Sequence, residues 1–370
     1  MAFTDGTTQA LVAYEPKNGR PDIRLEEVEL RKLADDELLV CIVAVGVCHT
    51  DLLFATWPAD QIPYPRVLGH EGSGIVQQAG SRVSRASIGD SVLLSFRSCA
   101  ACKTCKDDHP SFCDQFAALN YAGELNAYTA TDSGKQRVHG GFFGQSSFAR
   151  VAIVKESSVV NVSGLVRGED ELKLLAPLGC GFQTGIGTVE NVASAGPEDA
   201  VVVLGLGGVG LAAIMAAKLK GCKTIIGVDR LPGRLALAEA LGATGVIDTV
   251  NKGVEIGEEV KKLNNNDGPS VTIDTTGNMD LIRGAVQWTA NRGQIIIVGV
   301  PPPDALFNLH LIEFMQTGKV IRGSIEGDAD PSKYVPRMIK WYREGKLPFE
   351  KLVKFYPVTM SPRSSSGKVQ

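Results

Sequence analysis

The sequence predicts an α/β protein in which a mostly β domain precedes a doubly wound parallel sheet. Its 370 residues exceed what one ordinary hydrophobic core holds, so two domains are expected. From about Ala10 to Val160, short apolar runs are separated by Gly, Pro and Asp, as in a barrel-like or irregular β domain. After Asp199, apolar runs alternate with helical patterns, which is typical of a parallel sheet flanked by helices.

The individual elements follow from these patterns in chain order. In the first half, strands are predicted over residues 37–47, 74–78, 91–95 and 148–154. In the second half we expect strand 201–204, helix 209–220, strand 224–228, helix 234–241 and strands 271–274 and 294–300. The last strand ends at the proline run 301–303, because proline lacks a backbone donor. We expect domain boundaries near Pro177 and Gly323, and hence domains over residues 1–176 and 177–323.

The composition argues against several classes of protein. Hydrophobic residues make up 44% and charged residues 21% of the chain, and the net charge of −3 favours neither a nucleic-acid nor a membrane partner. The first residues lack the basic start and apolar stretch of a signal peptide, so a cytoplasmic location is expected. The uncharged run 201–217 approaches the length of a membrane span, but its glycines fit a strand, turn and helix better.

A glycine-rich turn joins the strand 201–204 to the helix that follows it. Gly205, Gly207 and Gly210 form the pattern G-x-G-x-x-G, with Gly208 and Val209 inside it. The first glycine permits a tight turn, the second lets a pyrophosphate approach the backbone, and the third lets helix and strand pack closely. The helix N-terminus then faces the phosphates, so the segment predicts a Rossmann dinucleotide site. A glycine turn without a nucleotide is the alternative.

Asp229 favours NAD as the dinucleotide. It lies at the end of the next predicted strand, where a carboxylate can bind the adenosine ribose hydroxyls and repel a 2′-phosphate. Arg230, the next residue, leaves NADP open as the alternative.

Four of the eight cysteines are clustered, which suggests metal binding rather than disulfides in a reducing cytosol. Their short spacings let one loop, residues 97–114, wrap a tetrahedral zinc ion with the ligands Cys99, Cys102, Cys105 and Cys113. Four sulfur ligands leave no open position, so this zinc would be structural. Unligated thiols are the alternative, but this loop is polar, and exposed free thiols are reactive.

Two further segments place potential metal ligands at strand ends. The segment 48–51 (CHTD) follows one apolar strand, and the segment 69–71 (GHE) lies one strand, loop and strand further on. Each segment alone is weak evidence, because a core thiol and a hydrogen-bonded buried imidazole would explain Cys48 and His70 without a metal.

With all these motifs in order, the chain resembles the zinc-dependent medium-chain alcohol dehydrogenases over nearly its whole length. The resemblance rests on 46–51 (GVCHTD), 68–74 (LGHEGSG), the cysteine quartet, 178–185 (LGCGFQTG), the glycine loop and 298–302 (VGVPP). It implies a GroES-like β-barrel catalytic domain, a Rossmann NAD-binding domain and an active site between them. It also implies that residues 324–370 return to the catalytic domain.

The resemblance assigns Cys48, His70 and Cys180 as ligands of a catalytic zinc, with Glu71 as a carboxylate that can approach the metal. Three protein ligands leave the fourth position for water or substrate. Cys180 is far from His70 in the sequence, so only the resemblance identifies it. Asp51 is expected to orient the His70 ring from behind. Together with the quartet, this gives two zinc ions per chain.

The reacting groups come from the same resemblance. Thr50 matches the hydroxyl that accepts the alcohol proton and passes it toward the nicotinamide ribose, and His49 would lie near the pyrophosphate. Some relatives complete this relay with a histidine at the position of Leu53, so its last step is unassigned here. Further contacts with NAD are expected from Thr184, Arg234, Val298 and Val300.

The implied activity is reversible hydride transfer between NAD and a primary alcohol or its aldehyde. Segments 95–102, 109–113 and 142–148 resemble the benzyl- and aryl-alcohol branch, so an aromatic or cyclic alcohol is the expected substrate. Polyol and glutathione-linked formaldehyde oxidation are alternatives within the class, and a non-catalytic zinc- and dinucleotide-binding sensor or structural protein is the alternative outside it. The family further implies a homodimer or homotetramer.

The C-terminal segment departs from the family pattern. Relatives usually continue beyond a segment such as 355–358 with an amphipathic helix and a final strand, whereas this sequence ends in the Ser-rich segment 361–370, which we expect to be loosely ordered. A basic cofactor contact of the family therefore has no counterpart, and weaker NAD binding than in full-length relatives is expected.

Overall fold

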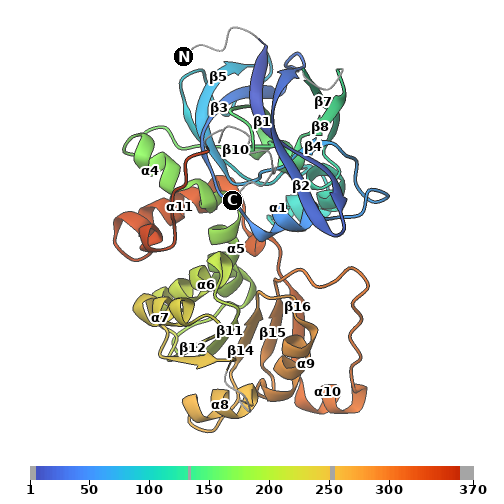
Figure 1. The fold of residues 1–370 in the computed structure, drawn as a ribbon. Coiled ribbons are helices and arrows are strands. Elements are labelled where there is room, and N and C mark those ends of the chain that lie inside the picture. Colours follow the sequence, from blue (N-terminus) through green and yellow to red (C-terminus); the bar gives the residue numbers. More distant parts are fainter. Residues whose placement is uncertain (1–5, 132–134, 251–254, 359–370) are drawn as a thin grey trace.

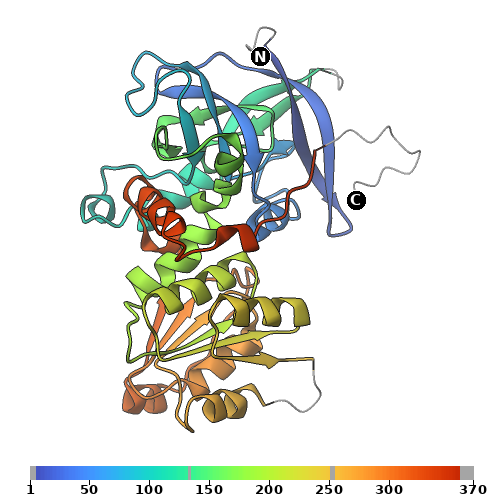
Figure 2. The same ribbon diagram turned by 90° about the vertical axis from the view of Figure 1, so that its left-hand side faces the viewer.

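The computed structural model describes residues 6–131, 135–250 and 255–358. Figure 1 shows two lobes, one built around a β-barrel and one around a parallel sheet, with helix α5 (Gly181–Gly187) between them. Figure 2 shows that the C-terminal part of the chain returns to the barrel lobe. The expectations for residues 361–370 and for the missing family elements lie outside the described residues.

The barrel lobe combines two sheets. Five strands close a barrel in the order β1-β2-β7-β8-β4, and five more form a sheet in the order β10-β6-β5-β3-β9. The barrel strands are β1 (Thr7–Lys17), β2 (Arg20–Leu30), β7 (Glu124–Ala130), β8 (Arg137–Gly140) and β4 (Arg66–Val67). The other strands are β10 (Val159–Asn161), β6 (Ser91–Leu94), β5 (Gly72–Ala79), β3 (Glu37–Val45) and β9 (Val151–Lys155). The predicted β domain is thus a GroES-like arrangement of short strands.

The second lobe is built on a fully parallel sheet. Its order is β13-β12-β11-β14-β15-β16, which is the doubly wound order of dinucleotide-binding folds. The strands are β11 (Ala200–Leu204), β12 (Thr224–Asp229), β13 (Gly245–Asp248), β14 (Val271–Asp274), β15 (Gln294–Ile297) and β16 (Val320–Gly323). The winding reverses between β11 and β14, so the loop after β11 lies at the point where such sheets bind ligands. The predicted α/β fold class is confirmed.

Helices cover both faces of this sheet, as the alternating apolar pattern predicts. Helices α6 (Gly208–Leu219) and α7 (Pro232–Leu241) pack on one face, and α8 (Ile256–Leu263) and α9 (Met279–Trp288) pack on the other. The remaining helices are α1 (His49–Phe54), α2 (Lys103–Lys106), α3 (Phe116–Asn120), α4 (Glu169–Leu174), α10 (Leu311–Thr317) and α11 (Pro331–Arg343). Single turns are η1 (Pro110–Phe112), η2 (Phe142–Gly144), η3 (Glu156–Ser158), η4 (Ala176–Gly179), η5 (Thr188–Val192), η6 (Glu326–Asp328) and η7 (Phe349–Lys351).

Two predicted strands differ from the structure by three residues at one end. Strand β9 begins only at Val151, because Phe148 and Ala149 pair with β1 of the barrel instead. Strand β15 ends at Ile297, because the backbone N–H groups of Val298 and Gly299 both turn to the carbonyl oxygen of Asp274. Both differences arise from tertiary hydrogen bonds that the local pattern does not encode.

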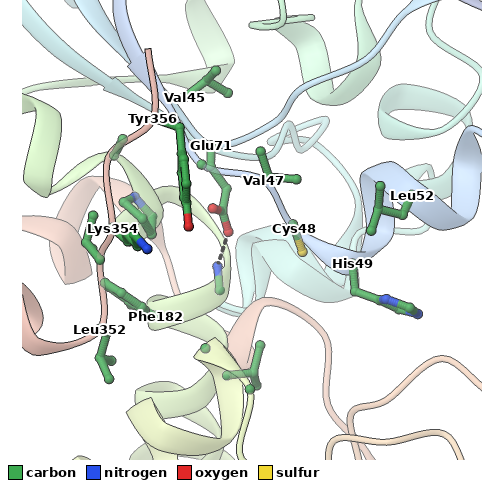
Figure 3. Close-up of a pocket in the computed structure, with 18 of the residues that line it drawn as sticks. Val45, Val47, Cys48, His49, Leu52, Glu71, Phe182, Leu352, Lys354 and Tyr356 are labelled. Carbon is green, nitrogen blue, oxygen red and sulfur yellow. Dashed lines mark hydrogen bonds between the residues drawn. The ribbon is translucent and has the colours of Figure 1, made fainter. Parts of the chain in front are cut away.

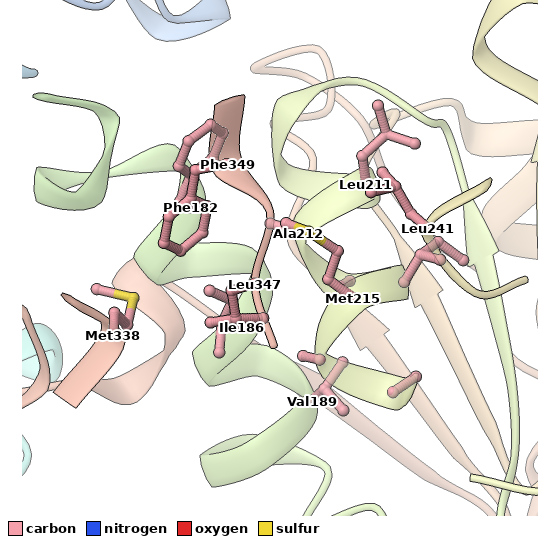
Figure 4. Close-up of a cluster of buried hydrophobic side chains, with 14 of the residues drawn as sticks. Phe182, Ile186, Val189, Leu211, Ala212, Met215, Leu241, Met338, Leu347 and Phe349 are labelled. Atoms are coloured by element: carbon pink, nitrogen blue, oxygen red, sulfur yellow. The ribbon is translucent and has the colours of Figure 1, made fainter. Parts of the chain in front are cut away.

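A single apolar core joins the two lobes. Figure 4 shows Phe182 and Ile186 of α5 packed between α6 and the C-terminal residues Leu347 and Phe349. The rings of Phe182 and Phe349 stack with centroids 5.0 Å apart. Burial of this kind stabilises by roughly 25 cal/mol per Å² of apolar surface, so the lobes are held by packing as well as by the chain. No helix within the described residues is long and apolar enough to cross a membrane.

Candidate active site and cysteine clusters

A cleft runs between the two lobes. Its lining from the barrel lobe includes Cys48, His49 and Glu71, and the segment 352–358 borders it as well. The sheet lobe contributes the glycine loop 205–209 together with Asp229 and Arg234. Figure 3 shows Lys354 and Tyr356 of the C-terminal segment across from Cys48 and His49. The cleft therefore brings several of the predicted nucleotide residues and two predicted metal ligands to one space.

Four potential metal ligands converge at the inner end of this cleft. One ligand atom from each of Cys48, His70, Glu71 and Cys180 lies within 4.8 Å of the other three. They come from the start of α1, the loop before β5 and the start of α5. Cys180, which no spacing could identify, thus lies where the family resemblance expects it.

Asp51 ties two of these segments together. Its carboxylate is almost fully buried and accepts hydrogen bonds from the backbone N–H of Cys48 at 3.1 Å and of Gly69 at 3.0 Å. The Nδ1 of His70 lies 2.9 Å from the same carboxylate. A carboxylate behind the ring fixes its orientation and directs the second nitrogen, Nε2, toward the two thiols.

The donor set fits a zinc ion with an open position. The His70 Nε2 atom is buried and has no hydrogen-bond partner, although a buried polar atom without a partner is costly. It faces the thiol of Cys48, and two thiols with one imidazole are ligands that zinc prefers. A metal ion would satisfy Nε2, so these residues fit the group that the resemblance implies.

Glu71 is held back from the cluster by the backbone of α5. Its Oε1 atom accepts a hydrogen bond of 2.9 Å from the Gly181 N–H (Figure 3). A side chain at Gly46 would come within 1.9 Å of the other carboxylate oxygen and would displace the Glu71 carboxylate. Burial and the charge of Cys48 raise the pKa of Glu71 well above its ordinary value. The carboxyl group is therefore close to the thiols but anchored elsewhere.

Glu326 is a residue of this site that the sequence analysis missed. It is buried, accepts a hydrogen bond of 3.1 Å from Gln183, and lies close enough to Cys180 to interact with it. Burial raises the pKa of Glu326 to about 7. It belongs to η6, where Glu326, Gly327 and Asp328 all have positive φ angles. No motif in the sequence marks such a turn, since two of its three residues are not glycine.

The predicted reacting and nicotinamide residues lie in different surroundings. The Thr50 hydroxyl is 3.6 Å from the Cys48 sulfur, and His49 is exposed in the cleft. Thr184 is buried in α5, and Val300 is half exposed beyond β15. Of these predicted residues, only His49 lines the cleft. Thr50 lies beside Cys48, and the Thr184 N–H donates to the Cys180 carbonyl oxygen at 2.8 Å.

Aromatic rings form a wall beside His70. The ring of Phe143 stacks on the imidazole at 4.5 Å, and Phe142 meets it edge-on at 5.6 Å. Phe54, Trp57, Phe116 and Tyr121 extend this aromatic wall through contacts of 5.0–6.1 Å. These rings belong to or pack against the buried core of the barrel lobe, and none of the six lines the cleft.

The cysteine quartet forms a second, separate cluster. The sulfur atoms of Cys99, Cys102, Cys105 and Cys113 all lie within 4.8 Å of one another. The Cys99 and Cys105 sulfurs are 3.9 Å apart, and a tetrahedral zinc with Zn–S bonds of about 2.3 Å requires about 3.8 Å. Backbone N–H groups point at the sulfurs of Cys99 and Cys113, which favours thiolates. The geometry fits a closed four-sulfur site.

His109 of this loop has a different partner. Its Nδ1 lies 2.9 Å from both carboxylate oxygens of Asp328, and the Ser111 hydroxyl donates to the same carboxylate at 3.2 Å. The loop is thereby docked on η6, the turn that carries Glu326. The His109 side chain is half exposed and is not part of the four-sulfur cluster.

The glycine loop has the shape that a dinucleotide requires. Gly205 has φ +86°, and a side chain at Gly210 would come within 1.9 Å of the Gly205 carbonyl oxygen. At Gly207, a Cβ atom would meet no atom within 4 Å, because this position faces the open cleft. The first glycine thus permits the tight turn, the second leaves space for a phosphate, and the third allows close packing.

Asp229 closes this loop from the end of β12. Its carboxylate accepts hydrogen bonds from the backbone N–H groups of Leu206, Arg230 and Leu231 at 2.7–2.9 Å, and Arg234 lies 3.6 Å away. Burial opposes its ionisation, but these donors prevail and lower the pKa of Asp229. A fixed negative charge therefore borders the cleft beside the glycine loop.

Comparisons with known proteins agree with this architecture. Residues 34–164 match the family model described as the alcohol dehydrogenase GroES-like domain, and residues 208–344 match the one described as zinc-binding dehydrogenase. The chain is 38% identical to geraniol dehydrogenase of Castellaniella defragrans over 359 residues, which are 96% of this chain and 94% of that protein.

Solved structures share the whole fold. The structure of an alcohol dehydrogenase zinc-binding domain protein from Burkholderia ambifaria matches with a TM-score of 0.87 and 35% identity. Benzyl alcohol dehydrogenase from Acinetobacter calcoaceticus matches with a TM-score of 0.84 and 36% identity. Each match covers 95% of this chain and 92% of the other. The chain therefore belongs to the zinc-dependent medium-chain alcohol dehydrogenases, a family of oxidoreductases that act on alcohols.

Proposed function

We propose that the protein is an NAD-dependent alcohol dehydrogenase that interconverts a primary aromatic or cyclic alcohol and its aldehyde. The observation that carries the proposal is the convergence of Cys48, His70 and Cys180 at the inner end of a cleft that also holds the glycine loop. A protein that only binds zinc and NAD would need neither a metal site with an open coordination position nor a hydroxyl group beside that site. The kinship with catalytic dehydrogenases also argues against that alternative.

The residues of this chain would hold the metal ion and accept the proton of the alcohol. A bound zinc ion would supply Lewis acidity and bound NAD the hydride acceptor. Cys48, His70 and Cys180 would hold the metal, and Asp51 keeps the His70 ring in place. The Thr50 hydroxyl, at 3.6 Å from the Cys48 sulfur, is positioned to take the proton of an alcohol as it is oxidised. The quartet would hold a second, structural zinc.

Apolar side chains of the cleft support the substrate class. Val47, Leu52 and Phe182 line the cleft near Cys48 (Figure 3), so the ring of an aromatic alcohol would meet an apolar surface there, and aromatic pairs add about 0.5–1.5 kcal/mol beyond the burial of their area. Related proteins named geraniol dehydrogenase and benzyl alcohol dehydrogenase are consistent with a substrate of this size and polarity.

Metal analysis combined with an alcohol panel tests the proposal. We expect two zinc ions per chain, and NAD-linked oxidation of benzylic and cyclic alcohols with kcat/KM at least about tenfold above that of ethanol, since one tenfold step is about 1.4 kcal/mol of binding. Bound zinc and NAD with no turnover of any alcohol would instead identify a binding protein. A preference for polyols would contradict the substrate class alone.

Asp229 is expected to set the choice of cofactor. We predict that Asp229→Asn weakens NAD use by about 10- to 100-fold, the worth of one hydrogen bond to a charged group, and raises the ratio of NADP to NAD activity. Asparagine keeps an acceptor for the loop N–H groups, so the fold should survive. Asp248, which pairs with Asp229 in the next strand, offers the matched control Asp248→Asn. An equal change in both variants, or an unchanged ratio in Asp229→Asn, would refute the assignment.

An apolar surface suggests how two chains associate. Leu306, Leu311, Ile312 and Met315 are 62–80% exposed, and they lie near β16 at the edge of the sheet. An exposed strand edge with apolar neighbours is a surface that proteins normally cover. We therefore propose that two chains form a homodimer through this edge. Light scattering of the purified protein measures whether it is a dimer.

A further inference from the structure

Arg66, on strand β4 of the barrel, is a buried cation without a hydrogen-bonded counter-charge. Its side chain has no exposed surface, although a long charged side chain is almost never fully buried unless it is paired. The Nη2 atom donates to the Tyr121 carbonyl oxygen at 2.9 Å, while Nε and Nη1 have no partner. Among the described residues, no carboxylate therefore hydrogen-bonds to this guanidinium group.

A second buried polar atom without a hydrogen-bond partner belongs to the neighbouring strand. Strands β4 and β8 run side by side (Figure 1), and Arg66 is the register partner of His139. The Nδ1 atom of His139 is also buried without a hydrogen-bond partner. Burial and the charge of Arg66 lower the pKa of His139, so its imidazole is neutral at pH 7 and can present an N–H group. The pair then carries one positive charge and several unused donors.

The remaining surroundings of Arg66 are uncharged and tight. The guanidinium lies over the ring of Phe142 at 5.3 Å, and Tyr64 is close by. Gly123 lies close to the guanidinium group, since a Cβ atom at this position would come within 3.3 Å of Nη2. An isolated buried charge costs several kcal/mol, so the fold is expected to include something that compensates it.

We propose that Arg66 and His139 form a binding site for one small monovalent anion of the halide or formate class. Nε and Nη1 of Arg66 would donate to the anion, and Nδ1–H of His139 would complete the set. One net charge suits a monovalent ion, and the crowding by Gly123 and Phe142 excludes a large one. The site is distinct from the active site, because neither Arg66 nor His139 belongs to the metal-ligand cluster or lines the cleft.

Thermal unfolding of the zinc-loaded enzyme tests this site. In this experiment chloride or formate replaces gluconate at constant ionic strength. We expect the Tm of the wild type to rise by about 2 °C for each tenfold increase in anion concentration above the Kd. Arg66→Met should fold, since an apolar replacement of a buried charge is often neutral or stabilising, and its Tm should not respond. The exposed Arg137 lies on the same strand as His139, so Arg137→Met is the matched control and should respond like the wild type.

Bromide provides a direct test that needs no variant. Crystals of the zinc-loaded enzyme grown with bromide should show one anomalous peak within hydrogen-bond distance of Arg66 Nε or Nη1. A flat Tm in the wild type, an equal response in Arg66→Met, or bromide only elsewhere on the protein would overturn the proposal. In those cases water alone satisfies the two side chains.

Discussion

Cys180→Ala is expected to lower kcat/KM by about 10³-fold or more and to reduce the zinc content from two ions per chain to one. The loss corresponds to several kcal/mol of transition-state stabilisation, which is what a Lewis-acidic metal supplies. The thiol is one of only three strong zinc donors in the cluster at the inner end of the cleft, because Glu71 is bound to the Gly181 N–H. Kinetics with a benzylic alcohol and metal analysis of the same preparation measure both effects.

The chain offers a matched control for this variant. Cys222 is also a buried free cysteine, but it belongs to neither cluster, so Cys222→Ala should keep both zinc ions and most of the activity. Thermal unfolding of the two variants separates the loss of the metal from general damage to the core. Two zinc ions and near wild-type activity in Cys180→Ala would remove this residue from the site.

Thr50→Ala is expected to lower kcat by about 10²- to 10⁴-fold, the usual contribution of a positioned proton acceptor, while Thr50→Ser stays within a few-fold of the wild type. Serine keeps the hydroxyl beside Cys48, and alanine removes it. Both variants should retain two zinc ions, because Thr50 is no ligand, and this separates proton transfer from metal loss. Steady-state kinetics with zinc analysis are the measurements.

Thr56 is the control for this pair. It lies just beyond the end of α1, and its hydroxyl donates to the carbonyl oxygens of Leu52 and Leu53 rather than facing the cluster. Thr56→Ala should therefore leave kcat nearly unchanged. Equal rates for Thr50→Ala and Thr50→Ser would exclude the hydroxyl from the reaction.

The sheet lobe could be predicted closely because its signals are local. The strand before Gly205, the glycine turn and the acidic residue at the end of β12 lie within thirty residues of one another. Cys99 to Cys113 are equally local, and the structure brings their sulfurs together as the spacing suggests. In these segments the interactions that form the site involve residues within one turn or one strand of each other.

The catalytic cluster required information that no local pattern contains. Cys180 meets Cys48 only because η4 lies against β6, where a side chain at Gly179 would come within 1.9 Å of the Leu94 carbonyl oxygen. Glu326 arrives through a turn of positive φ angles, and Arg66 is buried by Tyr121 and Phe142. Such placements depend on contacts between distant segments, which a sequence pattern does not encode.

The Asp51 carboxylate orders the metal-binding loops before any ion arrives. It holds the backbone of Cys48 and Gly69 and the ring of His70 at once, so these three groups cannot drift apart when the ion is absent. Little conformational entropy is then lost when an ion binds, and preorganisation of this kind raises affinity. We therefore expect that a metal ion can bind and dissociate at this site without refolding of the lobe that carries it.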